Sequence, residues 1–296
     1  MSATQRRRPK KEKKPAVIIR LAWRLGYQPG RVMREVLEWI EVLAVAGALA
    51  ALIMIFVTVR MHVPTDSMYP TIDGDQNGWK ADSFFVDRIT YYFRDPKPGS
   101  IVVFRHTDAV FVQRIMEGSP AEAAGMADGE RLYYLNTVPV YTKTLAEDAL
   151  ARWEDGTPLL LSTIGGGQYD LGEKPTGAST FEDLGIVIRE KRIRYVKRLV
   201  AVGGQTVYIE DGDIYVDGER LEDERFDREY DSNSPHYLFG VNPEVPTVVP
   251  EGHYFVLGDN SKASFDSRYW GFVDDRDMIG VPYLRVWPLN RFGLMR

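Results

Sequence analysis

Residues 194–202 read RYVKRLVAV, a short run of apolar and β-branched side chains that contains one lysine among its arginines. A run of this length and composition is typical of a buried β-strand. Lys197 would then lose hydration, which disfavours its charged form and lowers its pKa from about 10.4 toward neutral pH. A lysine at a strand edge can instead keep its ammonium group in water. On these residues alone, both interpretations of Lys197 stay open.

A serine between two prolines is the second feature of the sequence. Residues 62–71 read HVPTDSMYPT, and Pro64 and Pro70 keep this segment out of a helix, so we expect Ser67 on a rigid extended turn. A serine hydroxyl is a poor nucleophile unless a positioned base takes its proton, and an uncharged lysine can be that base. The motifs G-x-S-x-G and S-x-x-K are absent, which argues against α/β-hydrolases and penicillin-binding enzymes. Taken alone, Ser67 also fits a plain turn.

Composition narrows the chemistry further. The 296 residues are enough for about two folded units, and 44% hydrophobic with 27% charged residues is ordinary for a folded protein. The sequence has no cysteine, so it has no disulfide framework, no thiolate nucleophile and no cysteine-built zinc site. Its 4 histidines are scattered and form no H-E-x-x-H motif. We therefore expect neither a metal nor another cofactor.

An uncharged run at residues 42–59, VLAVAGALAALIMIFVTV, lies near the start of the chain. At about 1.5 Å per residue, a helix of this length crosses most of the hydrocarbon layer of a bilayer. We expect a transmembrane helix over residues 39–60. A buried core helix or a cleaved signal peptide is the alternative, but the run exceeds the apolar stretch of a signal peptide.

The charges are divided unevenly about this run. Residues 1–34 carry eleven Lys or Arg against the single acid Glu12, a net charge of +10, so the rest of the chain carries −15 of the total of −5. The positive-inside rule places the basic segment, residues 1–38, in the cytoplasm and the acidic body outside. Because membrane topology and anionic lipid explain the basic tail, we expect no nucleic-acid partner.

Five blocks in order resemble the type I signal peptidases, or leader peptidases, a family of membrane-anchored Ser/Lys proteases. After the apolar run these are PTDSMYPTI (64–72), FFVDRITYYFRDPKPGSIVVFR (84–105), YVKRLVAVGG (195–204) and VPEGHYFVLGDNSKASFDSRYWGFV (249–273). The resemblance implies a mainly β fold. It implies a β-rich catalytic domain over residues 61–105 and 191–296, behind one N-terminal transmembrane helix in a bacterial cytoplasmic membrane.

The resemblance also implies roles for individual residues. Ser67 matches the nucleophile and Lys197 the general base, while the Thr65 hydroxyl and the Ser67 backbone N–H match the oxyanion hole. Four further positions match residues that support the site: Ser264, which hydrogen-bonds and orients the lysine, the ion pair Asp266 and Arg268, and Gly258, the small residue beside the lysine. Two positions depart from the family pattern, with polar partners replaced: Ser261 and Ala263.

Residues 106–190 separate two of these blocks and have a pattern of their own. We expect a strand at 109–115, a short helix within 118–126, a helix at 144–153 and a strand at 157–164. The stretch GSPAEAAGM and the helix after it resemble a PDZ domain, which binds a peptide at a sheet edge and holds its carboxylate with backbone N–H groups. In a circularly permuted order, that loop matches Leu184, Gly185 and Ile186. An α/β insertion without a ligand is the alternative.

Together, these features predict a membrane-anchored serine endopeptidase that removes N-terminal signal peptides from exported precursor proteins. Its partners would be those precursors, the lipid bilayer and a peptide or protein ligand of the insert. One alternative is a soluble self-cleaving Ser/Lys repressor, and another is a catalytically degenerate, membrane-tethered scaffold that binds peptides through the insert. The separation of the Ser67 and Lys197 side chains decides between a dyad and a scaffold, because proton transfer requires about 2.6 to 3.2 Å.

Overall fold

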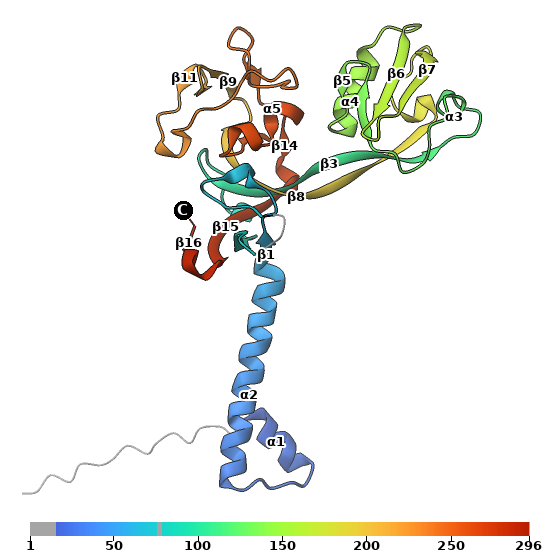
Figure 1. The fold of residues 1–296 in the computed structure, drawn as a ribbon. Coiled ribbons are helices and arrows are strands. Elements are labelled where there is room, and N and C mark those ends of the chain that lie inside the picture. Colours follow the sequence, from blue (N-terminus) through green and yellow to red (C-terminus); the bar gives the residue numbers. More distant parts are fainter. Residues whose placement is uncertain (1–15, 76–78, 296) are drawn as a thin grey trace, which may run out of the picture. The chain divides into compact units, whose positions relative to one another are not determined.

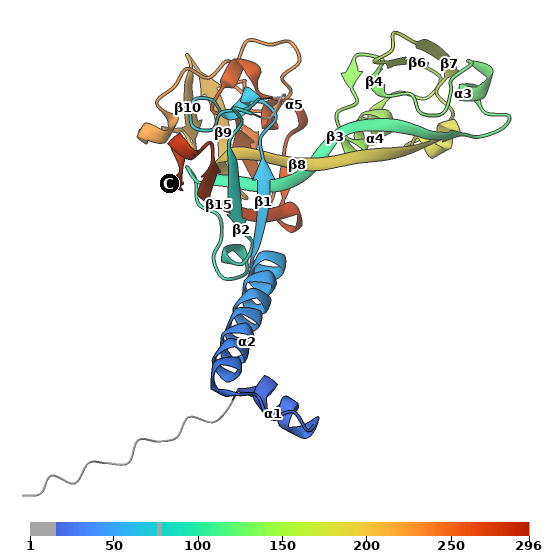
Figure 2. The same ribbon diagram turned by 60° about the horizontal axis from the view of Figure 1, so that its bottom comes forward.

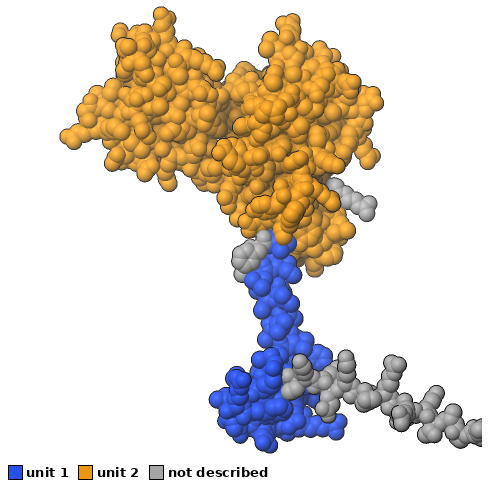
Figure 3. Space-filling view, turned by 180° about the vertical axis from the view of Figure 1, so that it is seen from behind, with its two compact units in different colours: residues 1–58 blue, residues 59–296 orange. Residues whose placement is uncertain are grey.

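The computed structural model describes residues 16–75 and 79–295. Residues 1–58 and 59–296 form two compact units, which Figure 3 draws in blue and orange. The basic cluster at residues 6–14, on which the cytoplasmic placement of the N-terminus depends, lies outside the described residues.

The described part of the first unit, residues 16–58, contains the α-helices α1 (Val17–Arg24) and α2 (Arg31–Leu52). The Glu41 carboxylate on α2 accepts the backbone N–H of Ile18 at 2.8 Å. This amide belongs to the first turn of α1, where backbone N–H groups have no partner within the helix. Glu41 therefore ties the start of α1 to the middle of α2, and Ile19 is buried beside it.

The transmembrane helix expected over residues 39–60 is not observed with those bounds. Helix α2 ends at Leu52, a π-helix follows over Ile53–Val57, and strand β1 (Thr58–His62) begins at the next residue. Glutamates occupy the first half of α2, so its uncharged part runs only over residues 42–52, and the β-branched end of the apolar run joins the sheet instead. Within residues 16–75 and 79–295, no helix is both long enough and apolar enough to cross a membrane.

The second unit is built on an 8-stranded sheet with the order β1-β2-β15-β3-β8-β13-β14, and β16 pairs with β15. Figure 2 shows β1, β2 and β15 next to one another. The pairings from β2 onward are antiparallel, and the strands are β2 (Ser83–Asp87), β3 (Ile101–Ile115), β8 (Ile186–Val202), β13 (His253–Leu257), β14 (Val273–Asp274), β15 (Met278–Trp287) and β16 (Gly293–Leu294). The buried strand predicted around Lys197 is confirmed, because residues 196–201 of β8 are all buried.

A smaller sheet of 4 strands, in the order β11-β10-β9-β12, packs its apolar side chains against the end of β8. Its strands are β9 (Thr206–Glu210), β10 (Asp213–Val216), β11 (Glu219–Arg220) and β12 (Thr247–Val248). Asp211 and Gly212 connect β9 to β10 with φ of 50° and 86°. Two central residues with positive φ suit the twist of a tight hairpin. The short helix α5 (Ser267–Trp270) follows β13.

The insert grows out of the two longest strands. β3 and β8 pair from Ile101 opposite Arg198 to Ile115 opposite Ile186, so the expected boundaries at residues 106 and 190 fall inside one continuous ladder, visible as the long ribbon of Figure 1. At its end lies a separate sheet in the order β5-β4-β6-β7. The insert contains α3 (Pro120–Ala123), β4 (Leu132–Leu135), β5 (Val138–Pro139), α4 (Lys143–Arg152), β6 (Pro158–Thr163) and β7 (Gln168–Glu173).

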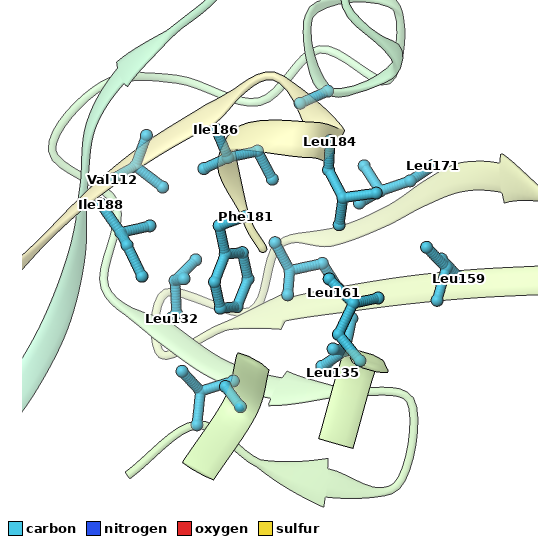
Figure 4. Close-up of a cluster of buried hydrophobic side chains, with 14 of the residues drawn as sticks. Val112, Leu132, Leu135, Leu159, Leu161, Leu171, Phe181, Leu184, Ile186 and Ile188 are labelled. Atoms are coloured by element: carbon cyan, nitrogen blue, oxygen red, sulfur yellow. The ribbon is translucent and has the colours of Figure 1, made fainter. Parts of the chain in front are cut away.

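Local signals explain the helices of the insert. The Ser119 hydroxyl accepts the N–H of Glu122 at the start of α3, and the Thr142 hydroxyl accepts the N–H of Leu145 at the start of α4. Both are N-caps that satisfy amides left free in the first turn. The insert has a core of its own around Phe181, which Figure 4 shows among leucine and isoleucine side chains from β4, β6 and β8.

Candidate active site

The side chains of Ser67 and Lys197 are in contact. Ser67 lies on a single 3-10 turn (Asp66–Met68) after β1, and Lys197 projects from the middle of β8. Their exposed fractions are 6% and 2%, and Lys197 Nζ donates to Ser67 Oγ at 2.6 Å. The two residues that the sequence singled out separately are therefore brought within hydrogen-bond distance.

Burial also changes the chemistry of the lysine. Loss of hydration is the main cause that lowers the pKa of Lys197 to about 8, while the negative charges of Asp266 and Asp259 act in the opposite direction. The nearby Arg268 adds to the decrease. An amine with a pKa near 8 is neutral in a substantial fraction of molecules at neutral pH and can accept a proton from a hydroxyl. The interpretation of Lys197 as a solvated strand-edge residue is therefore wrong.

Thr65 and Asn260 flank the serine. Thr65 Oγ1 lies 3.4 Å from Ser67 Oγ, on extended backbone just before the 3-10 turn. The backbone N–H of Asn260 donates to the Ser67 carbonyl at 3.0 Å, and its side-chain amide donates to the Asp66 carbonyl at 3.1 Å. Asn260 thus fixes the backbone on which the serine hydroxyl stands. Sequence reasoning did not assign this residue, although it lies in the block that contains Gly258.

The ion pair of Asp266 and Arg268 is present and fully buried. Arg268 Nε and Nη2 donate to the two carboxylate oxygens of Asp266 at 2.9 and 2.8 Å, and both side chains are 0% exposed. Ser261, which departs from the family pattern, also binds this arginine. Its hydroxyl accepts Arg268 Nη1 at 2.7 Å and the backbone N–H of Asp231 at 2.7 Å. The departure therefore retains a hydrogen-bonding side chain at the buried guanidinium.

The expected hydrogen bond from Ser264 to Lys197 is wrong. Ser264 Oγ is buried and has no hydrogen-bond partner among the described residues. It faces Gly258, where the methyl carbon of an alanine would stand 2.1 Å from Ser264 Oγ and 2.5 Å from the Ser67 carbonyl oxygen. Asp266 holds the Gly258 N–H at 3.0 Å, which keeps this backbone close against both serines. Only glycine fits at position 258, because the Ser264 side chain and the Ser67 carbonyl occupy the space that a side chain would need.

The family model of the signal peptidases, peptidase S26, matches residues 36–287. The chain belongs to this family. It is 28% identical over 257 residues to a probable signal peptidase I-1 of Synechocystis sp., covering 86% of this chain and 85% of that protein. It is 26% identical over 283 residues to a signal peptidase I of Mycobacterium tuberculosis, covering 91% and 79%. The chain is accordingly a serine peptidase, a hydrolase.

A solved structure of a signal peptidase I from Enterococcus faecalis V583 is also similar in sequence, with 37% identity. The match covers 30% of this chain and 81% of that chain, with a TM-score of 0.24.

A second buried ion pair ties the peptidase's serine segment to the strand of Lys197. Arg198 Nε and Nη2 donate to the Asp259 carboxylate at 2.7 and 2.6 Å, and Asp259 also accepts the Thr71 hydroxyl. Three segments far apart in the chain are joined in this way. No local pattern predicts this pairing, because the residues are separated by 61 and 188 positions along the chain.

Ser67 and Lys197 line a cavity of about 430 Å³. Met61, Val63 and Thr65 line it from β1 and the turn after it, and Ala263, the second departure from the family pattern, lies at its border. In the part of the chain that the structure describes, no group of three or more His, Asp or Glu side chains is placed to hold a metal ion. A buried serine hydroxyl next to an amine of lowered pKa is an arrangement that can carry out acyl transfer.

The carboxylate-binding loop expected at residues 184–186 is wrong. The N–H groups of Leu184 and Ile186 donate to the Phe181 carbonyl at 3.1 and 2.9 Å, and that of Gly185 donates to the Glu182 carbonyl at 2.9 Å. All three amides close the end of a 3-10 turn, which Gly185 terminates with φ of 78°. Because their hydrogen bonds are used within the chain, they are not free to hold a ligand carboxylate.

Proposed function

We propose that the peptidase removes N-terminal signal peptides from exported precursor proteins, with Ser67 as the nucleophile and Lys197 as the general base. The 2.6 Å contact between the two buried side chains carries this proposal. The relatives named signal peptidase I support the substrate class. A catalytically inactive scaffold that only binds peptides does not require a buried lysine of lowered pKa next to a serine.

The reaction follows from the positions of three groups. Neutral Lys197 takes the Ser67 proton as Oγ attacks the carbonyl carbon of the scissile bond, and the Thr65 hydroxyl and the Ser67 backbone N–H donate to the oxyanion. The Lys197 ammonium then protonates the leaving amine, and the C–N bond breaks to leave an acyl-enzyme. Water, deprotonated by Lys197, attacks the ester, and the Ser67 oxygen leaves with the proton that the lysine returns.

We place this reaction at the outer face of a bacterial cytoplasmic membrane, with the uncharged residues 42–57 that precede β1 as the anchor. The uncharged run at 42–59 supports this, and so do the exposed apolar side chains that α2 carries, among them Val42, Leu43 and Leu49. A precursor held in the same bilayer by its own apolar segment meets the peptidase at a raised local concentration. Alkaline carbonate extraction and protease protection of spheroplasts test the placement, and release of the intact chain by carbonate contradicts it.

The decisive experiment measures cleavage of a signal-bearing precursor by the full chain in detergent. Ser67→Ala and Lys197→Met should each abolish cleavage, because one removes the nucleophile and the other the base. Lys191→Met is the matched control, since Lys191 lies on the same strand but its side chain is 60% exposed. Full turnover by either active-site variant would leave the scaffold as the better function.

A groove beside α4 favours a second, binding function for the insert. A cavity of about 1100 Å³ is lined by Leu145 and Asp148 of α4 and by Glu190 and Arg192 of β8. Among the described strands, β8 has a partner on one edge only between residues 186 and 197, and an open strand edge next to a groove can accept an extended peptide. Selection of a random peptide library on the immobilised chain tests this, and equal recovery on a Leu145→Arg variant contradicts it.

A further inference from the structure

The cavity that holds Ser67 and Lys197 is bordered by the insert as well as by the catalytic sheet. Side chains of β4, the segment after β5 and the turn after β6 line it, and we call four of them the insert wall: Tyr133, Val140, Tyr141 and Ile164. These residues lie in the part of the chain that separates the catalytic blocks in the sequence. The reactive serine and the insert therefore face the same enclosed space.

Two side chains of the insert wall, those of Tyr133 and Ile164, are exposed to a ligand. Tyr133 and Ile164 are 43% and 51% exposed, although both are large apolar groups that a folded chain gains by burying. The neighbouring Leu132 on β4 is buried in the insert core. Two exposed side chains of this kind at the border of one cavity form a surface that an apolar side chain of a bound segment can cover.

Aromatic contacts hold this wall against the catalytic domain. The Tyr141 ring meets the Phe265 ring edge to face with centroids 5.2 Å apart, and it meets the Tyr269 ring at 5.7 Å in the same way. Phe265 directly follows Ser264, and it lines the same cavity. Each such pair contributes about 0.5 to 1.5 kcal/mol beyond its buried area. The wall is thus fixed to the loop that packs against Gly258.

The cavity is long enough for several residues of substrate. Ile193, Tyr195 and Lys197 alternate along one face of β8 and all line it. At about 3.3 Å per residue, Ile193 lies about 13 Å from Lys197 along the strand, which is the length of about four residues of an extended polypeptide. The insert wall borders the same cavity, so its side chains face substrate residues that extend along it from the scissile bond.

We infer that the insert is part of the substrate site, where Tyr133 and Ile164 bind an apolar side chain of the precursor away from the scissile bond. This inference rests on the proposed function, because it assumes that a polypeptide is cleaved at Ser67. It makes the insert a determinant of which precursors are cleaved well. The wall acts through binding and not through the chemical step.

The test uses the full chain in detergent and a set of peptides that span one signal-peptide cleavage site. At each position on either side of the scissile bond in turn, one peptide carries leucine and a second peptide carries serine. For the peptide with leucine at the position that meets the wall, Tyr133→Ala should raise KM about tenfold with kcat unchanged. The preference for leucine over serine at that position should be lost, and preferences at the other positions should remain.

Two further variants keep the test independent of misfolding. Tyr133→Phe retains the apolar ring and should behave as the wild type does. Leu160→Ala removes another exposed apolar side chain of the insert, which is 53% exposed and is not among the described residues that line the cavity, and it should leave the positional preferences intact. A loss in Tyr133→Ala that is equal for all peptides, a loss in kcat alone, or no loss at all would overturn the inference. Retained cleavage by Ser67→Ala would overturn the proposed function instead.

Discussion

Lys197 Nζ lies 2.6 Å from Ser67 Oγ, and both side chains are buried. The base must be neutral to take the hydroxyl proton, and burial lowers the pKa of this amine to about 8. We therefore expect kcat/KM to increase about tenfold per pH unit up to about pH 8 and to stay constant at higher pH. A pH profile with a short precursor peptide measures this.

The shape of that profile discriminates between bases. A carboxylate base would give a plateau that begins well below pH 7, and a histidine base would give an inflection at about pH 6.5. A profile that is flat from about pH 6 upward would therefore remove Lys197 from the role of general base. Lys191→Met should leave the inflection in place, because the Lys191 side chain is exposed and pairs with Asp108 at 3.6 Å.

The same lowered pKa affects stability. The unfolded chain keeps the Lys197 proton up to a pH of about 10.4, whereas the folded chain releases it near 8, so the unfolded state binds more protons between these values. The free energy of unfolding then increases with pH across this window, and the full cost of burying the ammonium is present below it. At 1.36 kcal/mol per pKa unit this cost is about 3 kcal/mol.

Lys197→Met should therefore abolish activity and stabilise the fold at neutral pH, by up to about 3 kcal/mol. The gain should shrink as the pH rises through the window and be absent above about pH 10.4. Urea unfolding of the full chain in detergent at several pH values measures it. A Met variant that is less stable than the wild type at pH of about 7 would show that the amine contributes more through its contacts than it costs by burial.

Contacts between residues close together in the sequence could be predicted, whereas contacts between residues far apart in the sequence could not. The apolar run around Lys197 predicted its strand, because this signal is local. Ser67 and Lys197 are 130 positions apart, so only the family resemblance could join them in advance. No pattern of apolar spacing contains such a contact.

The failures have the same cause. The expected Ser264 bond depended on where a loop pinned by Asp266 and Asn260 would turn, and those hydrogen bonds come from other segments. The end of the apolar run was assigned to a helix, but Thr58 pairs into a sheet whose other strands lie far along the chain. In both places, tertiary contacts decided between local conformations that the sequence left nearly equal.

The oxyanion contribution of Thr65 can be measured directly. Thr65→Val keeps the shape and removes the hydroxyl that lies 3.4 Å from Ser67 Oγ. We expect kcat to fall by about 10²- to 10³-fold with little change in KM, because the donor meets a charge that exists only in the transition state. Thr65→Ser should recover most of the rate. If the Ser and Val variants lose the same rate, the hydroxyl has no role in the reaction.

Gly258 leaves no room for a larger side chain beside the nucleophile. A Cβ at this position would stand 2.1 Å from Ser264 Oγ and 2.5 Å from the Ser67 carbonyl oxygen, and the second atom belongs to the backbone that carries the nucleophile. Relief of the second clash requires a shift of residue 258 or of the Ser67 backbone, and either shift disturbs the contact between Ser67 and Lys197. Gly258→Ala should therefore destabilise the fold by about 1 to 3 kcal/mol and lower kcat by more than tenfold.

Two comparisons separate these effects. Gly165→Ala is the matched control, since Gly165 lies in an exposed turn with no heavy atom within 4 Å of the new methyl group, and it should leave both quantities unchanged. In the double variant Gly258→Ala with Ser264→Ala, the clash with the hydroxyl is removed but the clash with the Ser67 carbonyl remains. Stability should partly recover while kcat stays low. Recovery of both would show that Ser264, and not the nucleophile's backbone, sets the size limit at residue 258.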